Sequence, residues 1–379
     1  MSEWKKCPIG EVVTLRQGFA INAKSKHYMS KEETSLPLLR IADMKNGTKE
    51  VFVKEEIPQR FIAHPEDIIY TRTGNVGLVF RNNYGVMHNN CFSVTPNDAD
   101  ELSRDFLYYA LQNKTFFDTA NALARGAAQP DLPHTSFNSI EFAYPSLFVQ
   151  ERIAYILSRY DSLIENYQKQ IKLLEEAAQR LYKEWFIDLH FPEHENTNII
   201  DGVPEGWEKK KVGEVIAKVP RSKQIPTKDY QNEGAIPIID QSRDYIAGYT
   251  DDIESRVESN EPYIVFGDHT RILKYVPFPF AKGADGTQLI MSNNLDLMPQ
   301  CLLFTSLVSV DLSNYSYARH FKYLKEEEIL VPTASIANAF SKHVAKWYAK
   351  IQLNREQLRF LTEARDRLLP KLMSGEITV

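Results

Sequence analysis

One stretch constrains the fold of this chain more than any other. The segment from Val149 to Phe186 carries apolar side chains at intervals that alternate between four and three, and no glycine or proline interrupts it. This spacing keeps the side chains on one face of a long helix, and a strict heptad predicts a seam against another helix. The predicted seam residues are Ile153, Leu157, Tyr160, Ile164, Tyr167, Ile171, Leu174, Ala178, Leu181 and Trp185.

A second stripe follows 187 residues later and offers the first one a partner in the same chain. Its apolar seam residues are Phe340, Val344, Trp347, Ile351, Leu358, Leu361, Leu368 and Leu372. Asn354 and Arg365 occupy the two remaining positions, and polar seam residues commonly fix register or orientation. We therefore expect two paired helices of about 40 residues, each roughly 60 Å long. Two unrelated amphipathic helices docked on separate cores are the alternative.

The sequences around the helices also repeat, which indicates a tandem duplication. The offset between copies falls steadily from 203 to 187 residues, as loop deletions in one copy would require. The landmarks keep one order: Trp4 returns as Trp207, Pro37 as Pro237, Glu66 as Glu261, Arg125 as Arg319 and Pro145 as Pro332. Each copy thus consists of a globular domain followed by one long helix.

Both globular halves contain short β-branched and aromatic runs separated by Asn/Gly turns, which predict mixed, mostly β domains. The expected fold is α+β, with two tandem domains separated by a pair of long antiparallel coiled-coil helices in a pseudo-two-fold arrangement. The expected boundaries are 1–145 and 207–332 for the two domains, 146–190 and 333–379 for the helices, and 191–206 for a linker.

Composition limits the functional classes. The 379 residues are 43% hydrophobic and 25% charged, with a net charge of −5, so any contact with nucleic acid must come from local basic patches. The longest apolar run is too short to span a membrane, and the three cysteines are too few for a disulfide framework. We expect a cytoplasmic protein that does not associate with membranes.

Catalytic signatures are missing from the sequence. It contains no phosphate-binding G-x4-GK[ST] loop and no N-P-P-Y segment typical of amino-group methylation. Pro130-Asp131 lacks the E-x-K that a nuclease site would add, and His190 and His194 flank Pro192, which excludes a regular helical metal motif. We therefore predict neither catalysis, nor a bound cofactor, nor a metal site.

Turns in both halves carry the residue types that read base edges: Arg for guanine, Asn or Gln for adenine, and Ser or Thr as adaptable contacts. The DNA-binding candidates of the first half are Arg72, Thr73, Asn75, Asn89, Asn90, Arg125 and Gln129. Those of the second half are Arg243, His269, Thr270, Arg271, Asn293, Asn294, Arg319 and His320. The alternative is that the two Asn pairs only form turns and that Arg125 and Arg319 form structural ion pairs.

Several segments in this order resemble one family. EDIIYTRTG from Glu66, the loop ARG-x2-QP from Ala124, QERIAYIL after Pro145 and the ending ARDRLLPKLMSGEI are similar to a Type I restriction-modification specificity subunit. The resemblance implies two target-recognition domains that read the two halves of a split duplex DNA site. It also implies assembly with two DNA-adenine methyltransferase subunits and with restriction-translocase subunits. S-adenosylmethionine and ATP with Mg²⁺ would then be bound only by those partner subunits. The second helix departs from the pattern, because its entry lacks the Gln-Glu-Arg.

Two functional hypotheses follow. The favoured one is a non-catalytic DNA-sequence-reading subunit, and the alternative is a two-domain coiled-coil scaffold or adaptor that binds proteins. Salt-dependent, sequence-specific duplex binding separates them. Apolar residues outside the seam, at Ile156, Leu163, Leu173 and Phe186, predict a second stripe for methyltransferase subunits, unless they pack on the chain's own domains.

Overall fold

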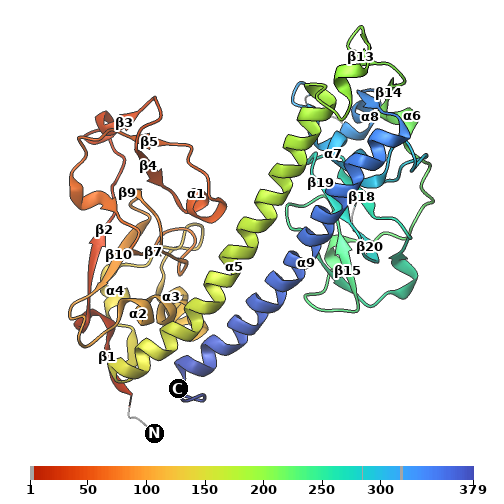
Figure 1. Ribbon diagram of the computed structural model, residues 1–379. Helices are drawn as coiled ribbons and strands as arrows, with labels where there is room; N and C mark the ends of the chain where they lie inside the picture. The colour runs from red at the N-terminus through yellow and green to blue at the C-terminus, as the bar shows by residue number, and fades with distance from the viewer. Residues whose placement is uncertain (1–3, 284, 316–318) are drawn as a thin grey trace. The chain divides into compact units, whose positions relative to one another are not determined.

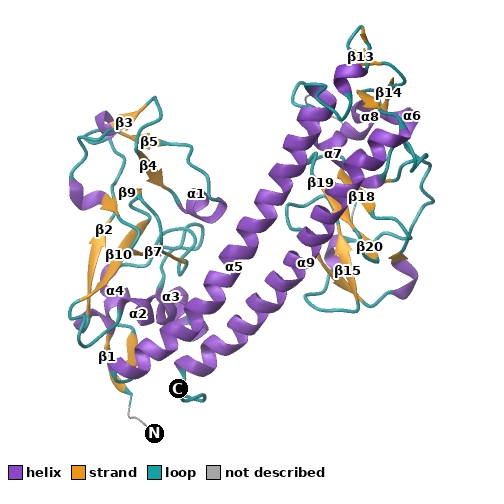
Figure 2. Cartoon of the chain, viewed as in Figure 1, coloured by secondary structure: helices purple, strands orange, loops and turns teal. Residues whose placement is uncertain are grey.

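The computed structural model describes residues 4–283, 285–315 and 319–379 (Figure 1). Contacts divide the chain into two compact units. The first unit comprises Met1–Ile164 with Phe360–Val379, and the second comprises Glu165–Arg359. Both contain helices and sheets, so the fold is α+β, as predicted (Figure 2). Each unit thus combines one globular half of the sequence with segments of both long helices.

The two predicted long helices are present. Helix α5 (Leu147–Tyr182) has 36 residues and continues into one π-helical turn, η4 (Lys183–Ile187). Helix α9 (Ala334–Met373) has 40 residues, and Pro370 lies in its last turn. Within the described residues, no helix is long and apolar enough to cross a membrane.

The segments of α5 and α9 run antiparallel within each unit, because residues further along α5 meet residues earlier in α9. In the first unit Ile153 shares a small hollow with Leu372, and Asp161 pairs with Arg365; in the second, Gln170 pairs with Asn354, and Trp185 with Phe340. The antiparallel pairing that the resemblance and the duplication predicted is therefore present in both units.

No predicted seam side chain is exposed. The fully buried members are Ile153, Leu157, Ile164, Ala178, Phe340, Val344, Ile351 and Leu372. The half-buried members are Tyr160, Tyr167, Ile171, Leu174, Leu181, Trp185, Trp347, Leu358, Leu361 and Leu368. The two polar seam residues also point across the pair: Asn354, 0% exposed, donates to Gln170 at 3.2 Å, and Arg365 donates to Asp161 at 3.0 Å. Such cross-helix polar contacts favour one register over others.

Besides its segments of the long helices, the first unit contains three sheets and four short helices. One sheet is β1 (Lys5–Pro8) with β11 (Glu141–Tyr144); the second is β2 (Val13–Gln17), β10 (Cys91–Pro96), β7 (Ile68–Thr71) and β8 (Val79–Phe80); the third is β3 (Met29–Ser30), β5 (Phe52–Val53), β4 (Leu36–Leu39), β9 (Gly85–Met87) and β6 (Ile62–Ala63). The helices are α1 (Ile41–Asn46), α2 (Arg104–Gln112), α3 (Lys114–Leu123) and α4 (His134–Asn138), with 3-10 turns η1 (Ile9–Glu11), η2 (Lys26–Tyr28) and η3 (Gln59–Phe61).

The described part of the second unit contains four sheets. They are β12 (Ile199–Ile200) with β13 (Val203–Pro204); β14 (Glu208–Lys211) with β22 (Glu328–Val331); β16 (Gly248–Thr250), β15 (Ile236–Ile239), β20 (Phe280–Lys282) and β17 (Arg256–Val257); and β19 (Leu273–Val276), β18 (Tyr263–Gly267) and β21 (Thr287–Ile290). Its short helices are α6 (Val212–Val215), α7 (Gln300–Ser309) and α8 (His320–Leu324), with 3-10 turns η5 (His194–Asn196), η6 (Thr227–Asp229) and η7 (Ile253–Ser255).

Strand register confirms that the two units repeat one plan. The antiparallel pair β1–β11 aligns Lys5 with Tyr144, and β14–β22 aligns Glu208 with Val331. A parallel pair in the middle of each unit aligns Leu39 with Met87 and Ile239 with Lys282. Glu208 follows Lys5 by 203 residues and Val331 follows Tyr144 by 187, which are the offsets that the sequence repeat predicts.

One predicted landmark does not correspond. Helix α3 separates α2 from α4 in the first unit, whereas the described part of the second unit has no helix between α7 and α8. Arg125 therefore lies nine residues before His134, the first residue of α4, whereas Arg319 directly precedes His320, the first residue of α8. The predicted equivalence of Arg125 and Arg319 is wrong, because the two residues precede their corresponding helices by different distances.

The stretch 191–206, expected as a linker, carries the η5 turn and the β12–β13 hairpin. Its first residue, Phe191, is 3% exposed and packs on Trp207 with ring centroids 4.7 Å apart. Phe186 packs on the same indole at 5.3 Å and is 4% exposed. The prediction that Phe186 belongs to an outer apolar stripe is therefore wrong, because its ring fills the core of the second unit.

Candidate nucleic-acid interface

Three predicted loops of the first unit meet where β7 ends and β10 begins. The backbone N–H of Arg72 donates to the carbonyl of Asn90 at 2.8 Å, and the N–H of Gly74 donates to the carbonyl of Pro130 at 2.8 Å. The N–H of Leu132 in turn donates to the carbonyl of Arg72 at 2.9 Å. These bonds join the 72–75 turn, the 89–90 turn and the 124–133 loop, so all seven candidates of the first half lie in one cluster.

Asp131 holds this cluster together. Its carboxylate accepts from Arg72 Nη2 at 2.7 Å and from Arg72 Nε at 3.1 Å, and Thr73 Oγ1 donates to it at 2.6 Å. Burial alone would raise the pKa of Asp131, but the hydrogen bonds from Arg72 and Thr73 outweigh it and the pKa is lowered. Arg72 also donates to Gln17 at 3.1 Å, so its guanidinium is a fixed structural group. Arg72 and Thr73 therefore position the loops.

The remaining candidates of this cluster keep their side chains available. Asn75, Arg125 and Gln129 are exposed, and Asn89 and Asn90 are half-buried. Within the described residues, none of these five side chains makes a hydrogen bond or an ion pair, although the backbone carbonyls of both Asn residues accept bonds. Arg125 is tied only through its backbone, which pairs with Asp131 in both directions at 2.8 Å. Four amides and one guanidinium therefore have no partner among the described residues, a set suited to base edges and phosphates.

The second unit presents a turn at the same point of its plan, where β18 ends and β21 begins. His269, Thr270 and Arg271 are exposed in this turn, which the N–H of Arg271 closes on the carbonyl of Gly267 at 2.7 Å. Arg271 has a φ of +61°, a left-handed conformation that L residues with a long side chain rarely adopt. Its Nη2 donates to the carbonyl of Tyr315 at 3.0 Å. The surrounding bonds hold this strained residue in place, as is common at functional sites.

Gln241 fixes the position of this turn. Its amide donates to the carbonyl of Asp285 at 2.9 Å, and it accepts from the N–H of His269 at 3.1 Å. Its backbone carbonyl accepts from Thr270 Oγ1 at 2.6 Å. Arg243, two residues further on, is exposed and has no ion pair within the described part of the chain. Gln241 thus performs for the second cluster the positioning that Asp131 performs for the first.

His320 does not belong to the exposed set. It is 4% exposed, and its two ring nitrogens lie 2.8 Å from the carbonyl of Asp268 and 3.2 Å from that of Tyr315. The imidazole therefore fixes the start of α8 and cannot reach DNA without unfolding this junction. Its neighbour Arg319 is exposed and remains a candidate.

Asn293 and Asn294 lie at the other end of β21, away from the 269–271 turn. Asn293 donates to the carbonyl of Glu214 at 2.7 Å, and the side chain of Asn294 accepts from the N–H groups of Asp296 and Leu297. The first unit repeats the former contact, because Asn97 donates to the carbonyl of Glu11 at 3.1 Å. The turn-forming alternative thus describes both Asn293 and Asn294, and neither joins the second cluster.

The residues that organise the clusters, Gln17, Asp131 and Gln241, are absent from the predicted set. In the sequence, Asp131 appears only as one carboxylate of an incomplete nuclease motif. A single acidic residue in a loop does not indicate that it will pair with Arg72. Gln17 and Gln241 follow strand-like runs, and only the meeting of distant loops assigns them their role.

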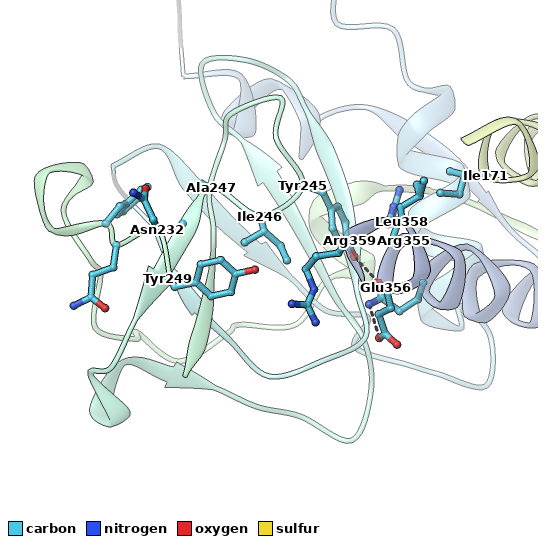
Figure 3. Close-up of a pocket in the computed structure, with 14 residues that line it drawn as sticks. Ile171, Asn232, Tyr245, Ile246, Ala247, Tyr249, Arg355, Glu356, Leu358 and Arg359 are labelled. Atoms are coloured by element: carbon cyan, nitrogen blue, oxygen red, sulfur yellow. Dashed lines mark hydrogen bonds between the residues drawn. The ribbon is translucent and has the colours of Figure 1, made fainter. Parts of the chain in front are cut away.

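A larger cavity of about 630 Å³ lies in the second unit between the β15–β16 region and the helix pair (Figure 3). Three tyrosines line it, and Arg355 on α9 lies 4.0 Å from the ring centre of Tyr245. Arg355 also pairs with Glu175 on α5 at 2.9 Å. Figure 3 shows Arg359 extending from the same helix towards the β16 side. Because Glu175 already neutralises Arg355, we interpret this cavity as a structural gap between the sheet region and the helices of the unit.

No cluster of three or more metal-ligating side chains occurs among the described residues. The rings of His190 and His194 lie 5.4 Å apart, and Nδ1 of His194 contacts the carbonyl of Phe191 at 2.9 Å.

Comparison with known proteins shows which family this chain is similar to. Residues 1–176 match the family described as Type I restriction modification DNA specificity domain. The Type I restriction enzyme MjaIX specificity subunit of Methanocaldococcus jannaschii is 29% identical over 314 residues, which cover 76% of this chain and 72% of that protein. The putative type I restriction enzyme MjaX specificity subunit of the same organism is 23% identical over 385 residues, with 92% and 89% covered.

The fold also matches a solved structure over nearly its whole length. The crystal structure of the Type-I restriction-modification system S subunit from M. genitalium superposes with a TM-score of 0.64 at 18% identity, covering 98% of this chain and 96% of that one. At this identity the likeness bears on the fold alone, and the sequence matches bear on the family. By sequence and by fold, the chain is therefore similar to Type I restriction-modification specificity subunits.

Proposed function

We propose that this chain recognises a split duplex DNA site, one half with each unit, and directs partner methyltransferase and restriction subunits to that site. The family that residues 1–176 match is described as a DNA specificity domain. The observation that carries the proposal is the position of the two clusters. Each lies where an inner strand of a sheet ends and its antiparallel neighbour begins, β7 with β10 in the first unit and β18 with β21 in the second. The clusters differ in composition, with amides prevailing in the first and Arg, His and Thr in the second. Different side chains at one structural position suit two different half-sites.

The base-reading set that we propose is narrower than the sequence candidates. In the first unit it contains Asn75, Asn89, Asn90, Arg125 and Gln129, and in the second it contains Arg243, His269, Thr270, Arg271 and Arg319. The recognition domains would span 1–145 and 207–332, the helices 146–190 and 333–379, and the connecting segment 191–206.

Partner subunits would bind the long helices. Several large apolar side chains are exposed there: Phe148 (66%), Tyr155 (59%) and Leu163 (47%) on α5 in the first unit, and Leu173 (53%) and Leu353 (47%) in the second. Arg152 and Arg159 cover the rings of Phe148 and Tyr155, and aromatic and arginine side chains are enriched in protein interfaces. We propose two methyltransferase subunits and the restriction subunits as occupants, in a cytoplasmic complex. S-adenosylmethionine, ATP and Mg²⁺ would be bound by these partners, because this chain is a specificity subunit and does not carry out the catalysis.

The deciding experiment is domain exchange. The chain is co-expressed with its host's methyltransferase subunits, with residues 1–145 replaced by the equivalent domain of a relative, and adenine methylation is mapped across the genome. We expect one half of the methylated site to change and the other to stay the same. A change in both halves, or no methylation that depends on this chain, would contradict the proposal.

Partner binding is tested separately. Leu163→Asp and Leu173→Asp place a charge on the exposed stripe, and Gln168→Asp places the same charge on an exposed polar position of α5 as a control. We expect the two leucine variants to lose methyltransferase subunits on co-purification and the control to retain them. Equal retention by all three would remove the stripe from the proposed interface.

A further inference from the structure

The second unit has an open sheet edge where the first unit has a strand. In the first unit β2 pairs with β10 over five positions, from Val13 opposite Pro96 to Gln17 opposite Phe92. In the second unit a single bridge remains, Ile216 opposite Ser292, and β21 is the edge strand of its sheet among the described residues. The chain then leaves the sheet through Pro220, whose missing N–H is incompatible with a central ladder.

A hollow of about 350 Å³ occupies this gap. Its polar lining comes from the departing segment, through Arg221, Ser222 and Gln224, and from the sheet, through Lys282 and Gln288. Lys282 is the last residue of β20, and Gln288 lies on the open edge of β21. Five hydrogen-bond donors, two of them cationic, therefore surround one space.

These donors lack partners. Within the described residues, the side chains of Arg221 and Lys282 make neither an ion pair nor a hydrogen bond, and Oγ of Ser222 is buried without a partner. A buried hydroxyl without a partner costs stability, so native structures rarely leave one unfilled. Burial lowers the pKa of Lys282, whereas the charge of Asp285 acts in the opposite direction. An anion in the hollow would satisfy all three groups.

The first unit offers no such charge at the equivalent place. Strand register puts Met87 where the second unit has Lys282, and Met87 is 0% exposed among apolar neighbours. Arg16, on the strand that fills the gap, pairs with Asp67 at 2.6 Å. The hollow and its spare positive charge are therefore particular to the second unit.

We propose that this hollow binds a backbone phosphate of duplex DNA beside the half-site read by the second unit. Arg221 and Lys282 would supply the charge, and Ser222, Gln224 and Gln288 the neutral hydrogen bonds. The β20–β21 turn next to the hollow is joined through Gln241 to His269, so a duplex that contacts the 269–271 turn lies within reach. Phosphate contacts fix the register of a protein on the duplex without reading sequence. The inference rests on the proposed function and adds a positioning site to it.

The test uses the full chain assembled with its methyltransferase subunits. Arg221→Gln and Lys282→Gln are combined, and binding is measured over a salt series on two duplexes: one that carries the methylated site and one unrelated sequence. We expect affinity to fall by the same factor on both duplexes and the slope of log K against log salt to decrease in magnitude by about 1, because the two cationic side chains hold a single phosphate. Lys228→Gln removes one positive charge from an exposed position outside the hollow and should leave the slope unchanged.

Neutral methylphosphonate linkages then locate the phosphate. A linkage beside the second half-site should weaken the wild-type complex and leave the double variant unaffected. A slope no lower than that of Lys228→Gln would overturn the proposal. The proposal would also be overturned if the double variant failed to assemble with its partner subunits while the salt slope stayed unchanged. That result would indicate that the open edge of β21 binds an extended peptide. The salt slope on the unrelated duplex tests the phosphate site even if the wild type shows no sequence preference. Failure of the phosphate-site proposal can therefore be told apart from failure of the proposed function.

Discussion

The junction between sheet region and long helices is polar in the first unit and aromatic in the second. In the first unit, Asp161 on α5 accepts from the hydroxyl of Tyr109 at 2.7 Å, from Arg365 at 3.0 Å and from Arg81 at 3.3 Å. These residues come from α2, α9 and the segment after β8, so one carboxylate joins the helix pair to the domain. Its side chain is 13% exposed, which makes the network largely desolvated.

The second unit replaces every member of this network. Tyr348 follows Asp161 by 187 residues and meets Thr305, the counterpart of Tyr109, through their hydroxyl groups at 3.0 Å. Tyr275 stands where the first unit has Arg81, and its ring lies 4.8 Å from that of Tyr348. A buried ion network gains little over apolar packing once desolvation is counted, so either chemistry can hold the same joint. The geometry of the junction is therefore shared, whereas its chemistry is free to change.

A small apolar cluster in the sheet region of the first unit shows the opposite change, because charged residues replace apolar ones in the second unit. In the first unit Phe80 and Met87 pack with Leu39 and Ile69. Strand register puts lysines at both places in the second unit: Lys274 opposite Val265 and Lys282 opposite Ile239. At these matched positions the second unit has tyrosines at the helix junction and lysines in its sheet region, where the proposed phosphate site lies.

The largest effect should come from the polar junction. Asp161→Ala removes the desolvated carboxylate that Arg81 and Arg365 share and leaves them only the exposed Asp105 and Asp366. Removing one partner of a desolvated pair costs about 3 kcal/mol. We expect amide hydrogen exchange to accelerate in the first unit and to stay near wild type in the second. Asp161→Ala combined with Arg365→Met should be milder than the single change. Equal acceleration in both units would show that the junction does not act locally.

Each unit should read only its own half of the DNA site. Arg271→Ala removes the strained, exposed arginine of the second cluster, and loss of one base contact costs about 1–3 kcal/mol of discrimination. We expect relaxed methylation at one position of one half-site, whereas Arg125→Ala should affect only the other half. Uniformly weaker methylation without relaxed sequence would identify Arg271 as a phosphate contact.

Sequence reasoning reached the fold because its main signals are periodic or repeated. The heptad of α5 and α9 and the landmarks from Trp4 to Pro332 record the long helices and the two copies. It also predicted the loops at Arg72 and His269 as DNA-binding, because each turn residue with base-reading chemistry can be recognised by itself in the sequence. It could not separate exposed from structural members: His320 and Asn293 have suitable side chains, but distant carbonyls occupy them. The positioning roles of Asp131 and Gln241 were not predicted, because their hydrogen-bond partners lie 28 to 59 residues away in the sequence.

The buried lysine of the second unit should give its stability a pH dependence that the first unit lacks. Burial lowers the pKa of Lys274 to about 8, with its side chain 4% exposed beside Asp240. Between about pH 8 and the unfolded value near 10.5, the unfolded chain binds more protons, so stability should rise with pH. We expect a gain on the order of 1 kcal/mol for the second unit between pH 8 and 9.5, measured by denaturant unfolding. Lys274→Met should lower this slope to what Lys282 contributes, whose pKa burial also lowers, and an unchanged slope in the variant would assign it to another group.

The smallest effect should come from the aromatic junction. Tyr348→Phe removes only the hydroxyl that meets Thr305, while the ring contacts with Tyr275 and Phe304 remain. A neutral hydrogen bond contributes about 1 kcal/mol, so the second unit should lose no more than that, about a third of the loss expected for Asp161→Ala in the first. Hydrogen exchange of α7 and β19 measures it, with Tyr348→Ala as the reference for loss of the whole ring. If Tyr348→Phe were as costly as Asp161→Ala, the second junction would depend on its hydroxyls, and the contrast between a polar and an aromatic joint would fail.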